Sequence, residues 1–121
     1  VSSDLVVECD TRMKAIVDTP HILQSDNRPD AVFCVNDDCA AGVLHAAKIL
    51  GVNIPEELSV CGFSDAPICR ATMPMLTTVQ QHGVEIGKRA MLRLLNRLNG
   101  DDKHPQTEMV PADLIVRETT L

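Results

Sequence analysis

The sequence is poor in aromatic residues. Phe33 and Phe63 are its only two among 121 residues, and it has no tryptophan or tyrosine. Because 45% of the residues are hydrophobic, the core must be filled by Val, Leu, Ile, Ala, Met and Cys, as is common where strands lie between helices. This composition favours a single α/β domain, which can bury roughly two thirds of its unfolded surface.

Motifs that carry catalysis or bind metals are missing too. There is no GxGxxG, GxxxxGK, GxSxG or HExxH motif, and the four histidines are scattered. The five cysteines form no CxxC pair, and their odd number within apolar runs indicates reduced, buried thiols. We therefore expect no enzyme, no cofactor and no metal site.

Two other interpretations of the polar residues stay open. Ser64 and His82 with an aspartate could form a hydrolytic triad, although any domain of this size contains such residues. Asp37 and Asp38 follow a predicted strand, as magnesium ligands do in receiver domains, but the second acidic cluster and late lysine of that pattern are not evident. We favour helix capping and solvation for these aspartates.

The charge balance and the apolar runs exclude further classes. A formal charge of −6 repels phosphate backbones, which argues against direct nucleic-acid binding. No stretch of 18 apolar residues occurs, and no basic region precedes an apolar run at the N-terminus, so we expect no membrane partner and a cytoplasmic protein. Because the sequence lacks an initiator Met, we also expect it to be cut from a longer chain.

Hydrophobic patterning predicts the main elements. Continuous apolar runs at 31–35 and 58–63 predict parallel strands, and apolar residues at helical spacing predict helices near 38–50 and 83–99. We therefore predict an α/β fold, a mostly parallel sheet with helices on both faces. Weaker patterns predict strands at 5–9, 76–80, 108–110 and 114–116, and a helical stretch at 13–25 that Pro20 should kink or restart.

Candidate ligand-binding residues follow the predicted strands. Ligands of open α/β sheets bind at the carboxyl ends of strands. The residues there are Asp10, Asn36, Ser64, Asp65 and Gln81. Neutral hydrogen-bonding groups with carboxylates suit a hydroxylated small molecule better than they suit a nucleophile with its base.

Two long blocks resemble the C-terminal region of the LacI/GalR family of bacterial transcription regulators. They are RPDAVFCVNDDCAAGVLHAAKILGVNIPEELSVCGFSDAP at 28–67 and PMLTTVQQHGVEIGKRAMLRLL at 74–95, and the ending PADLIVRETT is similar as well. The resemblance implies part of a two-lobed periplasmic-binding-protein-like type I fold. Residues 1–80 would belong to its C-terminal lobe, while 81–121 would cross over, add a helix to the N-terminal lobe and return. The DNA-binding headpiece would be absent.

The resemblance also implies partners. A regulator of this kind binds a sugar, nucleoside or related effector between its lobes, reaches operator DNA through the headpiece, and forms a homodimer. The matching dimer elements here are the predicted helix at 38–50 and the loop at 68–75. The alternative is an extracytoplasmic sugar-binding protein of the same fold that serves transport.

Family ligand positions carry over residue by residue. Asn36 matches an asparagine that faces the cleft, and Gln81 matches a polar position at the crossover. Ser64 stands where the family usually has a ligand-binding aspartate, whereas Asp65 keeps the second aspartate of that motif. Thr11 stands where several members place an aromatic side chain. These two departures remove the features that favour pyranose recognition and leave the effector open.

Overall fold

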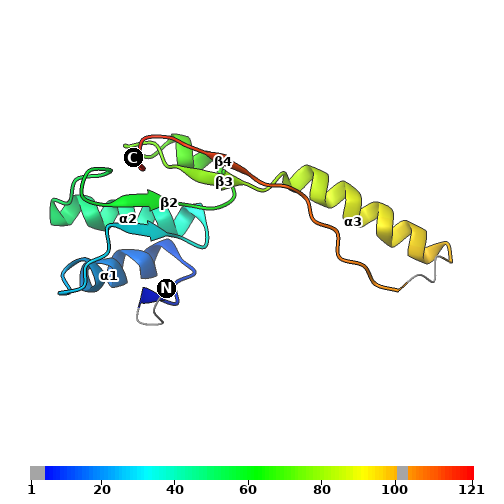
Figure 1. Cartoon of the computed structure of the whole chain (residues 1–121), viewed down its shortest axis with the longest axis horizontal. Coiled ribbons are helices and arrows are strands. Elements are labelled where there is room, and N and C mark those ends of the chain that lie inside the picture. Colours follow the sequence, from blue (N-terminus) through cyan, green and yellow to red (C-terminus); the bar gives the residue numbers. More distant parts are fainter. Residues whose placement is uncertain (1–4, 101–103) are drawn as a thin grey trace.

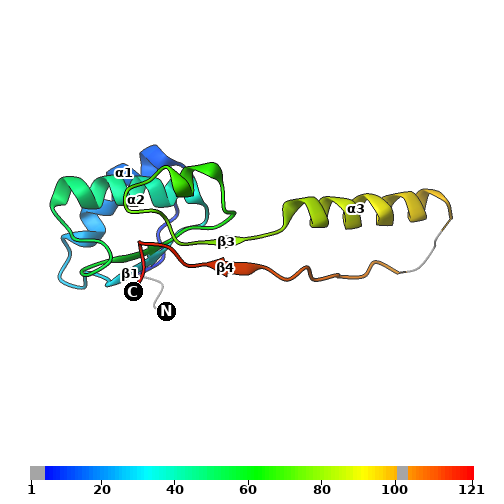
Figure 2. The same cartoon turned by 90° about the horizontal axis from the view of Figure 1, so that it is seen from above.

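The computed structural model describes residues 5–100 and 104–121. The elements in chain order are α1 (Arg12–Leu23), β1 (Ala31–Phe33), α2 (Asp37–Leu50), β2 (Ser59–Cys61), the 3-10 helix η2 (Pro67–Arg70), β3 (Thr78–Gln80), α3 (Gly83–Leu98) and β4 (Asp113–Ile115). Most of them form one body, from which β3 and β4 run together toward α3 (Figures 1 and 2).

The centre of the body is a parallel strand pair. In β1 and β2, Val32 is the register partner of Val60, and a parallel bridge from Cys61 to Thr77 extends the pairing toward β3. Continuous apolar runs are typical of parallel strands covered on both faces, which is why both runs were recognisable in the sequence. In β1, however, Ala31 and Phe33 are exposed. The predicted strands at 31–35 and 58–63 are confirmed in shortened form.

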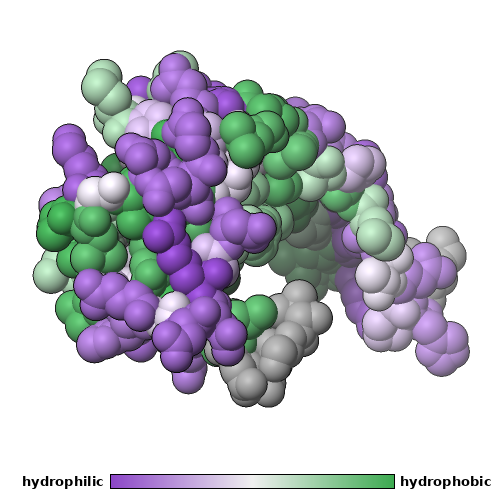
Figure 3. Space-filling view, turned by 60° about the vertical axis from the view of Figure 1, so that its left-hand side comes forward, coloured by the Kyte–Doolittle hydropathy of each residue, from purple (hydrophilic) through white to green (hydrophobic). Residues whose placement is uncertain are grey.

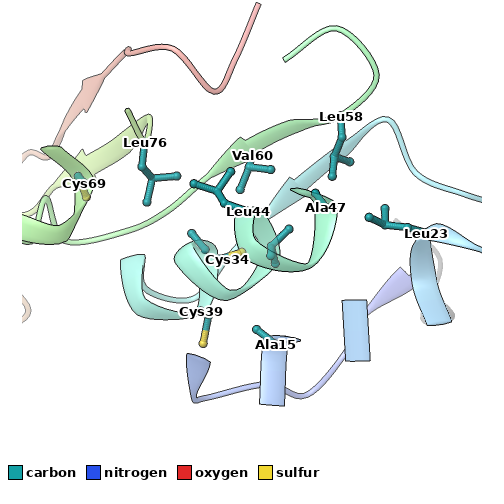
Figure 4. Packing of buried hydrophobic residues seen from close by; sticks show 12 residues of the cluster. Ala15, Leu23, Cys34, Cys39, Leu44, Ala47, Leu58, Val60, Cys69 and Leu76 are labelled. Carbon is teal, nitrogen blue, oxygen red and sulfur yellow. The ribbon is translucent and has the colours of Figure 1, made fainter. Parts of the chain in front are cut away.

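α2 covers one face of this pair. The Asn36 side chain accepts a hydrogen bond from the Cys39 N–H, and Gly51 ends the helix at a φ of 70°, a left-handed conformation that glycine adopts without strain. Leu44 and Ala47 on α2 pack with Val60 and Leu58 from the β2 side, and together they form the main core (Figure 4). The predicted helix at 38–50 is confirmed.

α1 packs on α2 and runs through Pro20 without restarting. Thr11 caps its first turn by accepting from the Lys14 N–H. Ala15, Thr19 and Leu23 are buried on both sides of the proline, so packing against the body offsets the hydrogen bond that Pro20 cannot make. The predicted restart is therefore wrong.

The opposite face of the β1–β2 pair is uncovered. Figure 2 shows α1 and α2 in one layer on the same side of the strands. Phe33 and Val35 are 65% and 62% exposed, and the Phe33 ring meets Phe63 edge-on with 6.1 Å between centroids. Among the described residues, helices thus cover one face of the sheet rather than the two we predicted.

Two predicted strands are wrong. The strands predicted at 5–9 and 108–110 are not formed in the described chain, and Val6 is 71% exposed. Apolar, β-rich sequence alone cannot make a strand, because the backbone needs a neighbouring strand to pair with. By contrast, the extended piece at 76–80 contains β3, and the predicted strand at 114–116 appears, shifted by one residue, as β4.

β3 and β4 form an antiparallel pair that leads to α3. Val79 is the register partner of Leu114. α3 confirms the predicted helix at 83–99, but it has no buried residue, and its apolar side chains, including Leu92 and Leu98, are exposed. Figure 3 likewise shows apolar patches between polar ones on the surface. None of the described helices is long and apolar enough to span a bilayer.

The contact between α1 and α2 predicts a strict size limit at Gly42. A Cβ there would lie 2.6 Å from the Arg12 carbonyl oxygen and 2.7 Å from the Ala15 Cβ. We expect Gly42→Val to destabilise the fold by about 3 kcal/mol in urea unfolding, because the helices must separate. Gly87→Ala on α3, where a Cβ meets nothing within 4 Å, should be neutral or slightly stabilising. Equal stability of the two variants would contradict this packing.

Candidate functional site

The turn after β1 places Asn36 at the start of α2. Its side-chain oxygen accepts from the Cys39 N–H at 2.8 Å, which fixes the side chain against the helix. The cap uses the carbonyl oxygen, so the NH₂ group is the half of the amide available to a ligand. Asn36 is half-buried.

Asp37, the next residue, is 1% exposed and joins three segments. One carboxylate oxygen accepts from the Thr78 hydroxyl of β3, and the other accepts from the Ala66 N–H at 2.7 Å. Gly62 lies so close that a Cβ there would collide with the carboxylate. Asp37 therefore holds the loop after β2 and the start of β3 against α2.

Asp38 faces elsewhere. Its carboxylate pairs with the Arg12 guanidinium, whose Nε lies 3.0 Å away, and it is half-exposed. Because Asp37 binds Thr78 and Asp38 binds Arg12, the two neighbouring carboxylates do not converge on a shared point. These contacts give both aspartates structural roles. The sequence pattern had suggested capping and solvation for them, and it did not reveal the bridging role of Asp37.

Ser64 and Gln81 are brought together from positions 17 residues apart. Gln81 Nε2 donates to Ser64 Oγ at 3.4 Å, and the Ser64 N–H donates to the Val79 carbonyl at 2.8 Å. Ser64 has a φ of 118°, so the loop turns sharply at this point. The two side chains form one polar pair beside β3.

An open concavity of about 380 Å³ lies next to this pair. Ser64 and Gln80 line it together with residues that begin α3, among them His82 and Glu85. The His82 ring is 2.7 Å from Asp113 on β4, whereas the Ser64 hydroxyl contacts Gln81. Ser64 and His82 thus have separate partners in the described chain, which gives no support to a hydrolytic triad.

Asp65 is held by two arginines. Its oxygens accept from Arg117 at 2.6 Å and from Arg70 at 2.8 Å, and its side chain is 7% exposed. Burial raises the pKa of this carboxyl, but the hydrogen bonds from Arg117 and Arg70 outweigh burial and lower the pKa below its ordinary value. Through Arg117, Asp65 anchors the C-terminal segment to the loop after β2. The sequence analysis did not identify Arg117 as its partner.

Asp10 lies at the other end of the candidate set. It is exposed and precedes the Thr11 cap of α1, and its charge acts on Cys39 in the first turn of α2. The Cys9 and Cys39 sulfurs are 3.9 Å apart. The structure therefore brings Ser64 and Gln81 together, while Asn36 and Asp10 lie apart from this pair, near Cys39 at the start of α2.

The chain matches one family model and many known regulators. The model is described as a periplasmic binding protein-like domain and matches residues 4–120. The HTH-type transcriptional repressor PurR of Vibrio atlanticus (strain LGP32) is 34% identical over 112 residues, which are 93% of this chain and 33% of that protein. The HTH-type transcriptional repressor CytR of Escherichia coli (strain K12) is 37% identical over 99 residues, 82% of this chain and 29% of that protein.

The fold is also similar to solved structures. A LacI family transcriptional regulator from Enterococcus faecium, solved with bound ribose, superposes with a TM-score of 0.78 at 27% identity. That match covers 91% of this chain and 40% of the other. The chain spans about a third of the length of the two repressors named above.

The buried ion pairs of Asp65 predict a pH-dependent stability. A carboxyl with a lowered folded pKa stabilises the fold above its unfolded pKa of about 4, and this stability is lost as the pH falls through the folded pKa. Asp65→Asn should therefore cost about 2 kcal/mol at pH 7 and flatten the acid limb of a urea-unfolding series from pH 7 to pH 3.

Asp38→Asn is the control for this series. Its pairing with Arg12 lies at the surface, where an ion pair contributes less than about 1 kcal/mol. If Asp65→Asn kept the acid limb of the unaltered protein, the anchoring role of Asp65 would be wrong.

Proposed function

This chain belongs to the periplasmic binding protein-like domain family, and we propose that it forms part of the effector-sensing module of a LacI-type transcription regulator. The observation that carries the proposal is the family match from residue 4 to residue 120. The named relatives are repressors, which favours regulation over the alternative of sugar transport outside the cytoplasm. The regulator would work in the cytoplasm without catalysing a reaction.

The proposed ligand contacts are the amides and hydroxyl of Asn36, Ser64 and Gln81, which we term the effector wall. We propose Asp10 as a further contact of the effector, and Asp65, which Arg117 holds, as the residue that fixes the loop carrying Ser64. Neutral amides both donate and accept, so they suit a hydroxylated effector such as a sugar or nucleoside. Each hydrogen bond contributes only about 0.5–1.5 kcal/mol net, so several must converge to give useful affinity.

The remaining part of the cleft would come from a second lobe. We propose that residues 1–80 belong to the C-terminal lobe and that residues 81–121 cross over, place α3 on the N-terminal lobe and return. The support is α3 itself, a 16-residue helix without a buried residue that lies away from the body (Figure 1). Apolar side chains such as Leu94 and Leu95, about half-exposed here, would be covered there. Operator DNA would be bound by a headpiece outside this sequence.

The effector wall can be tested in the intact regulator once a thermal-shift screen of sugars and nucleosides has found a ligand. Asn36→Ala and Gln81→Ala should each weaken binding about tenfold or more in calorimetry, since each removes a hydrogen bond in a desolvated cleft. His45→Ala, an exposed residue of α2, should leave affinity unchanged. Ser64→Asp should change which ligand is preferred, because it restores a charged acceptor. If both alanine variants bound the ligand with unchanged affinity, the assignment of the effector wall as the ligand contacts would be wrong.

We further propose that the protein is a homodimer that uses α2 and the loop at 68–75. Ile49 on α2 is 70% exposed and Met73 in the loop is 91% exposed, so both present apolar area whose burial is favourable by roughly 25 cal/mol per Å². Met73→Asp should raise the dimer dissociation constant at least tenfold in analytical ultracentrifugation. Val17→Asp, at a 59% exposed position on α1, is the control. A protein that sediments as a monomer at high concentration would rule this interface out.

A further inference from the structure

Two cysteines from distant parts of the sequence meet beside the effector wall. Cys9 and Cys39, 30 residues apart, place their sulfurs 3.9 Å from each other. The Cys39 thiol also points at the Cys9 carbonyl, at 3.7 Å. Cys9 is half-buried, and Cys39 is 2% exposed in the first turn of α2.

We propose that Cys9 and Cys39 are a modification site, a thiol pair that closes to a reversible disulfide and thereby displaces the Asn36 cap. An S–S bond is about 2.05 Å long, so the two sulfurs need to approach by only about 2 Å. Residues 6–10 are in no helix or strand in the described chain, so this segment can move toward α2 without breaking a strand pairing. The sequence pattern, with no CxxC pair, had indicated reduced, buried thiols, whereas Cys9 is half-buried.

The oxidant required is a hydroperoxide; with hydrogen peroxide, the simplest one, the alcohol in the following steps is a water molecule. The Cys9 thiolate takes one oxygen from it, the O–O bond breaks and an alcohol leaves, so Cys9 becomes a sulfenic acid. The Cys39 sulfur then attacks the Cys9 sulfur, the S–O bond breaks, and the departing hydroxide takes up the Cys39 proton as water. In total the two thiols lose two electrons and two protons, and the hydroperoxide is reduced to an alcohol and water.

Exposure sets the order of these steps. Burial raises the pKa of Cys39 to about 11, and its hydrogen bond with Cys9 raises it further in the same direction, so Cys39 is a thiol at neutral pH. Cys9, the more exposed sulfur, meets the oxidant first. Cys34 and Cys69 are buried, and burial raises their pKa values to about 12 and about 11, which disfavours their oxidation.

The consequence for the effector wall follows from one hydrogen bond. The Cys39 N–H donates to the Asn36 side chain at 2.8 Å, so the part of the approach that Cys39 makes, as opposed to the segment at 6–10, changes the position of that amide. Oxidation would then alter the effector wall directly. The effect of oxidation on effector binding rests on the proposed function, whereas the disulfide and the loosened cap do not.

The test treats the intact protein with hydrogen peroxide and maps disulfides by mass spectrometry under non-reducing conditions. We expect a loss of two hydrogens, a Cys9–Cys39 crosslink located by fragmentation, and reversal by dithiothreitol. Cys34→Ser, a buried cysteine of the same core, should still form the crosslink, whereas Cys39→Ser should not. If Cys39→Ser fails to fold, Cys9→Ser removes the pair from its more exposed end.

A second measurement follows the hydrogen bond between the Cys39 N–H and the Asn36 side chain, and it needs no effector. Amide hydrogen exchange at Cys39, resolved by NMR, should become at least tenfold faster on oxidation in the unaltered protein and stay constant in Cys9→Ser. A crosslink between other cysteines, or none, overturns the proposed site. A Cys9–Cys39 crosslink with unchanged exchange overturns its effect on Asn36. Because neither readout needs a ligand, failure of the proposed function would be seen separately, as absent effector binding in the reduced protein.

Discussion

The buried carboxylate of Asp37 is the contact on which the arrangement of this domain depends. It receives hydrogen bonds from the Thr78 hydroxyl and the Ala66 amide, and the absence of a side chain at Gly62 makes room for it. Buried carboxylates are costly unless their oxygens are hydrogen-bonded, so the three segments must come together for Asp37 to be satisfied. The loop that carries Ser64 and Asp65 is thereby fixed relative to Asn36.

The C-terminal segment completes the body through hydrogen bonds that reach across the sequence. The Thr119 hydroxyl donates to the Val60 carbonyl at 2.7 Å and accepts from the Thr77 N–H at 2.8 Å. Arg117 adds its ion pair with Asp65, so residues near the end of the chain hold the loop after β2. A segment that leaves the body through β3 and returns through β4 is therefore tied at both ends, which suits a connection between two lobes.

Two of the proposed ligand contacts lie where elements of the fold meet. Asn36 and Gln81 sit at junctions between elements, the first at a helix start and the second between β3 and α3. Under the proposed function, a ligand that contacts both would link the body to the segment that leads to α3, and would thereby favour one arrangement of the proposed lobes. The His82–Asp113 contact lies at the same junction and ties the start of α3 to β4.

Local sequence determined the elements that need only near neighbours. The apolar period of α2, its Asn36 cap and its Gly51 stop lie within one stretch of chain, so pattern and capping chemistry sufficed to predict it. The run at 31–35 likewise predicted β1. The candidate residues were proposed for a similar reason, because each follows an apolar run, but the run before Asp10 forms no strand in the described chain.

Tertiary structure decided everything that needs a distant partner. The apolar residues at 5–9 form no strand because the described chain offers them no pairing edge, and Pro20 is tolerated because α2 supports α1 on both sides of it. No local pattern predicts that Thr78 is the partner of Asp37, or that Arg117 is the partner of Asp65. Hydrogen bonds and ion pairs of buried groups depend on distances in space, which the folded backbone sets. Helix periodicity and capping depend on separations of a few residues along the chain, which can be read from the sequence.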